Sequence, residues 1–198
     1  FPKYNLKDEG GRIGNLMNKR NSNFIYISSY ATHKNHNILI PLAKKIKEKK
    51  LNYKIFVTIL KSDDNEFLNA VVDDKLDDTI INLGLLKHSD VAHAYFHCHA
   101  VLFPSLLESY GIPFYEAMKF NKPIFTSDLD FAKDACEDFA FYFDPFDWLS
   151  IFNSMDQIHN KTQIKINIKK GSTKVANLPS WEQFIDKFIQ KSREFYYE

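Results

Sequence analysis

The chain has 198 residues, of which 44% are hydrophobic, so it can form one large domain with a sizeable core. Its formal net charge of +1 gives no global attraction to nucleic acid, so an anionic ligand has to be held by local groups. Two cysteines are too few for a disulfide framework and no apolar run approaches the length of a membrane span, so we expect a globular, cytoplasmic protein.

The first 22 residues are polar and have no regular pattern. They contain the string GGRIG at residues 10–14, which invites interpretation as a phosphate-binding loop. Because no strand precedes this string, a lead-in segment is the better interpretation. We therefore expect residues 1–22 to be a linker from a preceding domain and residues 23–198 to form one domain.

From residue 24 onward, short apolar runs alternate with amphipathic stretches. Strands are predicted at residues 24–28, 53–60, 79–83, 100–104, 123–126 and 139–143. Helices are predicted over residues 37–50, 89–97, 113–120, 129–136, 147–159 and 180–197, with a short helix in the loop at 61–75. This alternation indicates βαβ units and an α/β fold with a doubly wound, Rossmann-like parallel sheet.

The most informative stretch is residues 104–118, PSLLESYGIPFYEAM, at the change from strand to helix. Pro113 suits the first helical position, which would place Glu116 in the first turn of that helix. Glu108 would lie at the end of the preceding strand or just beyond it. Gly111 allows a ligand to approach the backbone closely, and the first amides of the helix can bind an anion.

Two carboxylates on either side of an anion site suit a particular ligand. A carboxylate accepts hydrogen bonds from paired sugar hydroxyls, each contributing about 1.5–3 kcal/mol. A nucleotide-diphosphate sugar would place ribose, diphosphate and sugar along such a site. The alternative is structural: Glu116 stabilises the helix dipole by about 0.3–1 kcal/mol, and Glu108 is a surface loop residue.

The stretch resembles the pattern P-S-x-x-E-G-F-G-[LI]-P-x-x-E-A-M of the glycosyl transferases group 1 family, which are retaining enzymes of the GT-B fold. Ser109 and Tyr110 stand where the family usually has Gly and Phe. The resemblance covers residues 23–197, the C-terminal half of a GT-B architecture. It is also carried by residues 24–35, 81–84, 122–147 and 180–182.

The resemblance implies roles for the residues that match the motif. Glu116 would bind the ribose hydroxyls, and Glu108 would be the catalytic residue that contacts the donor sugar. Lys34, which matches a Lys followed by Gly or Asn, would hold the diphosphate with the backbone amides of Gly111 and Ile112.

Other residues complete the predicted donor site. Ser109 and Tyr110 lie between the two glutamates. Ser29 occupies a position that commonly carries an Arg in the family, so one diphosphate contact is lost or supplied elsewhere. His33, beside Lys34, is a candidate to supply it, as is His36.

The resemblance also implies an activity and partners. The enzyme would be a retaining hexosyltransferase of polysaccharide or lipopolysaccharide biosynthesis, metal-independent and without a cofactor, using a nucleotide-diphosphate sugar. A glycan or lipid-linked acceptor would bind through an N-terminal domain absent from this sequence, so the chain alone should bind donor poorly and be inactive. Peripheral membrane contact through the lysine-rich runs at residues 44–50 and 165–170 is compatible with this, whereas nucleic acid is not expected.

Two other functions fit the same fold. One is a nucleotide-binding or partner-binding module without catalysis, and the other is a sugar-nucleotide epimerase. A metal enzyme is not expected. His93 and His97 have a zinc-compatible spacing on a predicted helix, and Cys98 and His99 follow, but Ala94 stands where a zinc protease has Glu.

Overall fold

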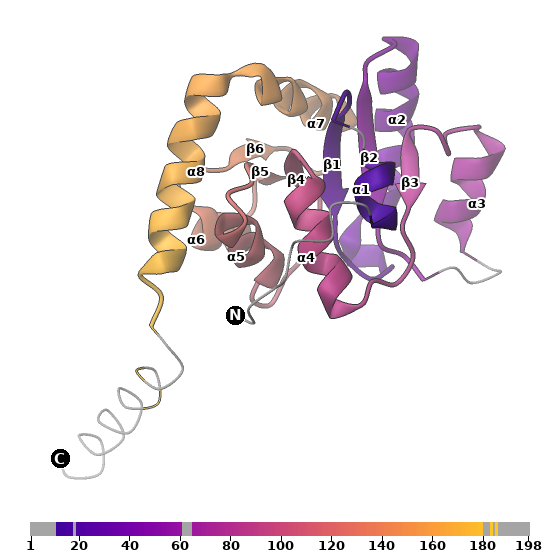
Figure 1. Ribbon diagram of the computed structural model, residues 1–198. Coiled ribbons are helices and arrows are strands. Elements are labelled where there is room, and N and C mark those ends of the chain that lie inside the picture. The colour runs from indigo at the N-terminus through magenta and orange to yellow at the C-terminus, as the bar shows by residue number, and fades with distance from the viewer. Residues whose placement is uncertain (1–10, 18, 61–64, 180–182, 184, 186–198) are drawn as a thin grey trace.

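The computed structural model describes residues 11–17, 19–60, 65–179, 183 and 185. Within this part, six parallel strands form one sheet in the order β3-β2-β1-β4-β5-β6 (Figure 1). The strands are β1 (Ser22–Tyr26), β2 (Tyr53–Val57), β3 (Ile80–Asn82), β4 (Ala100–Phe103), β5 (Ile124–Ser127) and β6 (Phe141–Phe143). The order reverses between β1 and β4, as in a doubly wound sheet, so the predicted fold class is confirmed.

The central strands are buried on both faces, which explains their continuous apolar sequences. All four residues of β4 are buried, as are the last four of β1. Phe24 pairs in register with Ile55 of β2 and with Ala100 of β4. Helices cover both faces of a parallel sheet, so such strands have no polar face.

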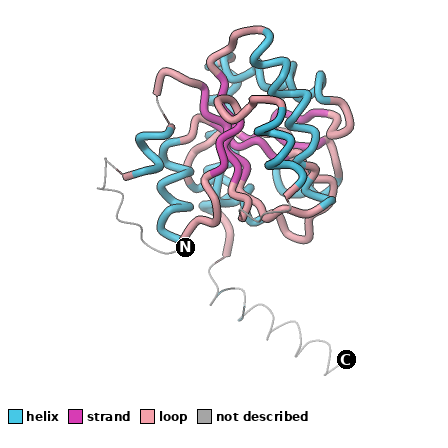
Figure 2. The backbone as a smooth tube through the Cα atoms, turned by 90° about the vertical axis from the view of Figure 1, so that its right-hand side faces the viewer, coloured by secondary structure: helices cyan, strands magenta, loops and turns pink. Residues whose placement is uncertain are grey.

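The helices form a layer on each side of the sheet (Figure 2). They are α1 (Arg12–Leu16), α2 (Leu39–Glu48), α3 (Glu66–Asp73), α4 (His88–His97), α5 (Ile112–Lys119), α6 (Asp130–Cys136), α7 (Trp148–Met155) and α8 (Lys161–Ala176), with 3-10 turns η1 (Thr32–Lys34), η2 (His36–Ile38) and η3 (Asp156–His159). Helix α2 packs against α7, α1 against α4, and α5 against α8. In α2, Leu39, Leu42, Ala43 and Ile46 are buried at helical spacing.

Two segments differ from the sequence-based prediction. Residues 12–16 were expected to be irregular, but they form α1, which buries Ile13; Met17 just after it is buried too. Helix α8, which has 16 residues, was not predicted as an element. The predicted helix over residues 180–197 lies outside the described residues, apart from 183 and 185.

None of the described helices has both the length and the apolar composition needed to cross a membrane.

Candidate functional site

The predicted site residues gather around the carboxyl ends of β1 and β4. These neighbouring strands flank the point where the strand order reverses. In open parallel sheets of this kind, ligands bind in the crevice at that point. The loop after β1 carries Lys34, and the loop after β4 carries Glu108.

Hydrogen bonds to the backbone fix the loop after β1. The Tyr26 hydroxyl donates to the carbonyl of Lys34 at 2.8 Å. Asn35 has a left-handed backbone, with φ of 55°, and its side-chain amide donates to the carbonyls of Pro104 and Pro145 at 3.2 and 2.8 Å. Only glycine and a few short polar residues adopt this conformation readily, which suits the Gly or Asn expected after Lys34.

The carbonyl of His33 joins the loop after β4 to the loop after β1. It accepts hydrogen bonds from the backbone amide of Leu106 at 2.7 Å and from the hydroxyl of Ser105 at 3.1 Å. The same hydroxyl lies 3.0 Å from the Leu107 carbonyl. Two segments about 70 residues apart in sequence are therefore held side by side immediately before Glu108.

Lys34 and Glu108 form an ion pair, with Nζ of Lys34 donating to Oε1 of Glu108. Their side chains are only 15% and 11% exposed, so the pair is poorly screened by solvent. The sequence placed these residues in one crevice, and the structure brings them into direct contact. Glu108 therefore lies in the loop five residues past the end of β4, with its charge balanced locally.

Gly111 precedes the first residue of α5 and has a left-handed backbone, with φ of 67°. A Cβ here would lie 2.6 Å from Cδ2 of Phe114, so the turn requires glycine for conformation and for space. Because α5 begins at Ile112, Pro113 is its second residue and not its first. Glu116 is accordingly in the second turn, and the prediction that it lies in the first turn is wrong.

Glu116 is partly buried and receives a hydrogen bond from a residue that the sequence did not single out. The Tyr95 hydroxyl on α4 donates to Oε2 of Glu116 at 2.9 Å. Burial raises the pKa of Glu116, while the bond from Tyr95 and the nearby His88 oppose that rise. The helix dipole does not explain Glu116, since the effect fades beyond the first turn.

The remaining predicted residues have exposed side chains. Ser29, His33 and Ser109 are exposed, and Ile112 is 58% exposed. Tyr110 is 65% exposed and stacks on Tyr115, with ring centroids 5.3 Å apart. These positions can be reached by a ligand without rearrangement of the core.

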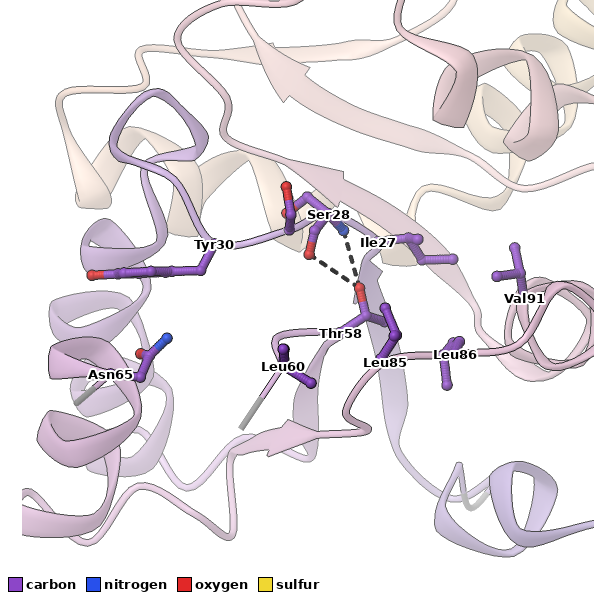
Figure 3. A pocket seen from close by; sticks show the side chains of 10 residues that line it. Ile27, Ser28, Tyr30, Thr58, Leu60, Asn65, Leu85, Leu86 and Val91 are labelled. Atoms are coloured by element: carbon purple, nitrogen blue, oxygen red, sulfur yellow. Dashed lines mark hydrogen bonds between the residues drawn. The ribbon is translucent and has the colours of Figure 1, made fainter. Parts of the chain in front are cut away.

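A pocket of about 450 Å³ opens at the carboxyl ends of β1, β2 and β3 (Figure 3). Its floor includes Ser28 and Thr58, which are joined by hydrogen bonds of 3.1 and 3.2 Å. Tyr30 borders one side and Val91 of α4 the other. Of the predicted residues, Ser29 lines this pocket, whereas Lys34, Glu108 and Glu116 are not among its lining residues. The lining residues are Ile27, Ser28, Ser29, Tyr30, Thr58, Leu60, Asn65, Leu85, Leu86 and Val91.

The ring of His36 is buried beneath the loop after β1 and packs against it. Its side chain is 1% exposed, stacks on Tyr26 at 4.8 Å, and lies 3.2 Å from the Ser28 hydroxyl through Nε2. Burial, with a smaller contribution from Lys34, lowers the pKa of His36 to about 4. The ring is therefore neutral at pH 7 and brings no positive charge toward a diphosphate.

The histidines of α4 and the two residues that follow it lie in different surroundings. His93 and His97 face a small cavity of about 90 Å³ beside Gly14 of α1. His99 accepts a hydrogen bond from the Asn23 backbone amide, and Cys98 is buried and free. Among the described residues, no group of three or more His, Cys, Asp or Glu is arranged to hold a metal ion.

The fold is a doubly wound, Rossmann-like domain with an ion pair at the point where the strand order reverses. Comparison with known proteins identifies its family: the profile of "Glycosyl transferases group 1" matches residues 12–175. The chain belongs to this family. A curated relative, the O-antigen chain mannosyltransferase RfbU of Salmonella typhimurium, is 28% identical over 68% of this chain and 38% of its own length.

Solved structures show the same GT-B domain fold. Sucrose-phosphate synthase from Thermosynechococcus elongatus superposes with a TM-score of 0.78, at 18% identity over 98% of this chain and 49% of that one. A glycosyltransferase from Rickettsia africae gives 0.76, at 16% identity over 96% and 54%. A mutant S. aureus TarM in complex with fondaparinux, alpha-GlcNAc-glycerol and UDP gives 0.74, at 17% over 86% and 35%. The chain thus spans about a third to a half of the length of these relatives.

Proposed function

We propose that this chain is the donor-binding domain of a retaining glycosyltransferase that acts in glycan biosynthesis. It would take a nucleotide-diphosphate sugar and pass the sugar to a glycan or lipid-linked acceptor. The observation that carries the proposal is the ion pair of Lys34 and Glu108 at the switch point, with Glu116 on the helix that follows, in a chain of the group 1 glycosyl transferases. The mannosyltransferase relative favours a hexose, and the UDP held by a structural neighbour favours a nucleotide leaving group.

Each group of site residues would bind a different part of the donor. Glu116 would accept hydrogen bonds from the ribose hydroxyls. The diphosphate would bind Lys34 and the amides of Gly111 and Ile112 at the start of α5, where the helix dipole favours negative charge. The pocket of about 450 Å³ next to Ser28 and Ser29 offers room for the base.

When the donor binds, Lys34 would exchange its ion-pair partner Glu108 for the diphosphate. A diphosphate competes with Glu108 for the ammonium group, and it carries more negative charge than one carboxylate. Once Lys34 turns to the phosphates, Glu108 is free to accept hydrogen bonds from the sugar. As the sugar bond to the diphosphate breaks, Lys34 compensates the negative charge that develops on the leaving group.

A titration of the full-length protein with GDP-mannose and UDP-sugars tests this assignment. Glu116→Ala and Lys34→Ala are each expected to weaken donor binding about tenfold or more, because each removes a charge-assisted hydrogen bond of about 1.5–3 kcal/mol. Glu48→Ala and Lys44→Ala are matched controls, since both residues lie on α2 and form exposed ion pairs, so their loss should leave affinity unchanged.

Two outcomes would contradict the proposal. Unchanged donor affinity in Glu116→Ala would remove the ribose role, and the absence of any nucleotide-sugar binding would remove the function itself. The stereochemistry is a separate measurement: NMR of the product anomeric proton should show the configuration of the donor retained.

A further inference from the structure

We propose that Tyr95 is a positioning residue that holds the Glu116 carboxylate in the orientation needed to bind the donor. This inference rests on the proposed donor-binding role of Glu116. Neither the motif nor the family match assigns a function to Tyr95, which lies on a different helix from Glu116 and 21 residues before it.

Packing in the core holds the Tyr95 side chain in one position, independently of its bond to Glu116. Tyr95 is fully buried on α4, and its ring stacks on Phe120, with centroids 5.5 Å apart and planes 16° from parallel. Phe120 follows the last residue of α5, one helical turn beyond Glu116. The phenol is thus packed against the same helix that carries its hydrogen-bond partner, and its hydroxyl has a set position.

That hydroxyl donates to one oxygen of Glu116 at 2.9 Å. A glutamate side chain has several rotatable bonds, so a free carboxylate would lose conformational freedom when a ligand binds. The bond from Tyr95 removes much of that freedom in advance. It occupies one of about four lone-pair sites on the carboxylate, and the remaining sites can accept hydrogens from two adjacent hydroxyls.

The electrostatics of the pair keep the donor and acceptor roles fixed. Burial and the neighbouring carboxylate raise the pKa of Tyr95 well above its usual 10, so the phenol stays protonated at neutral pH. Burial raises the pKa of Glu116, and the hydrogen bond from Tyr95 lowers it again toward the ionised form. The other titratable group on α4 that affects the pKa of Glu116 is His88, which lowers it. On the α8 side, Lys174 lowers the pKa of Tyr115, the residue before Glu116.

A structural role and a positioning role give different results in Tyr95→Phe. The substitution keeps the ring and its stacking on Phe120 and removes only the hydroxyl. If Tyr95 positions Glu116, the dissociation constant of GDP-mannose or a UDP-sugar should rise about fivefold to tenfold. The acidic limb of the binding profile should also move to higher pH, because the bond that lowers the pKa of Glu116 is lost.

Tyr53→Phe is the matched control. The Tyr53 hydroxyl is also hydrogen-bonded, to Asp156 at 3.0 Å and His159 at 2.8 Å. Tyr53 is the first residue of β2, so it lies at the amino ends of the parallel strands, away from the carboxyl ends where the site lies. Its loss should leave donor affinity and the pH profile unchanged, whatever it does to stability. Thermal unfolding of both variants separates a folding defect from a binding defect.

A double-mutant cycle with Glu116→Gln separates this inference from the proposed function. Full donor affinity in Glu116→Gln would overturn the role of Glu116 itself. If Glu116→Gln binds weakly while Tyr95→Phe matches the unaltered protein in affinity and pH profile, only the inference about Tyr95 fails. If Tyr95 acts through Glu116, adding Tyr95→Phe to Glu116→Gln should cause little further loss.

Discussion

Gly111 shows how a single residue sets the geometry of the start of α5. Its left-handed backbone turns the chain into the helix, and the ring of Phe114 fills the space where a Cβ would be. Any other L-residue there has to distort the turn or displace a phenylalanine that is fully buried. The amides that would receive a diphosphate lie on this turn.

Gly84 offers a direct comparison for Gly111. It has a similar φ of 74°, but no atom lies within 4 Å of a Cβ built on it. Gly84→Ala should therefore cost only the backbone strain, about 1–2 kcal/mol. Gly111→Ala should cost about 1–3 kcal/mol more because it also overpacks against Phe114. Urea unfolding of the two variants measures the difference, and equal losses would show that the contact with Phe114 is readily relieved.

At this scale the sequence indicates candidate residues but not every contact that they make. Glu108 and Glu116 are candidates by their spacing around the turn and Lys34 by the family resemblance, and their roles stay predictions. Tyr95 could not be identified in this way, because its role depends on which face α4 turns toward α5. The position of Glu116 was misjudged by one turn because the helix begins at Ile112 and Pro113 is second in it.

At the scale of elements, the site depends on three loops, each of which follows a different strand. Asn35, after β1, donates to Pro104 after β4 and to Pro145 after β6. One side chain therefore joins loops that are 69 and 110 residues away in sequence. Since Asn35 directly follows Lys34, these hydrogen bonds also fix the backbone from which the Lys34 side chain extends.

Replacing Asn35 by glycine isolates the contribution of these hydrogen bonds. Glycine keeps the left-handed backbone, so Asn35→Gly removes little besides the side chain. We expect a loss of about 1–3 kcal/mol, from two hydrogen bonds of about 0.5–1.5 kcal/mol each, together with weaker donor binding. Asn121→Gly is the control, because Asn121 has the same left-handed backbone, with φ of 54°, and an exposed side chain.

Chemical denaturation and donor titration of both variants test this role of Asn35. If the two glycine substitutions change stability and affinity to the same extent, the bridge between the loops contributes nothing beyond the backbone conformation.

The strands were predictable because each is an apolar or aromatic run, whereas the two missed helices have weak signals for opposite reasons. Helix α1 has only five residues and contains Gly14, beside which the ring of His97 packs. Helix α8 is long, but its buried positions are Asn167 and Gly171, and Ile164 and Val175, which pack against the core, are only partly buried. Gly171 lies against Met118 and Phe139, so this contact depends on a small residue and escapes a search for hydrophobic periodicity.

At the scale of the whole molecule, the buried ring of His36 links global stability to pH. In the folded protein its pKa is about 4, whereas in the unfolded chain it returns to about 6.5. Between these values the unfolded chain takes up a proton that the folded protein does not. This contribution to stability is therefore fully present above about pH 6.5 and is lost as the pH falls toward 4.

Measurements of the free energy of unfolding at several pH values test this prediction. We expect His36 to contribute up to about 3 kcal/mol of destabilisation between pH 6.5 and 4, at up to about 1.4 kcal/mol per pH unit. Carboxylates titrate in the same range, so the result is the difference between the unaltered protein and His36→Gln, which should have the shallower profile. His33→Gln, at an exposed position in the same loop, should keep the original slope; parallel profiles for all three proteins would refute the role of His36.

The central place of β1 in the sheet has a consequence for synthesis of the chain on the ribosome. Its partner β2 follows soon after it, but β4, on its other side, emerges only after 70 or so further residues. Until then the nascent chain carries an apolar strand with an unpaired edge, the kind of surface that aggregates or recruits chaperones. The pairing that covers this edge also brings Glu108 to Lys34, so the growing chain loses its aggregation-prone edge and assembles its site in the same step.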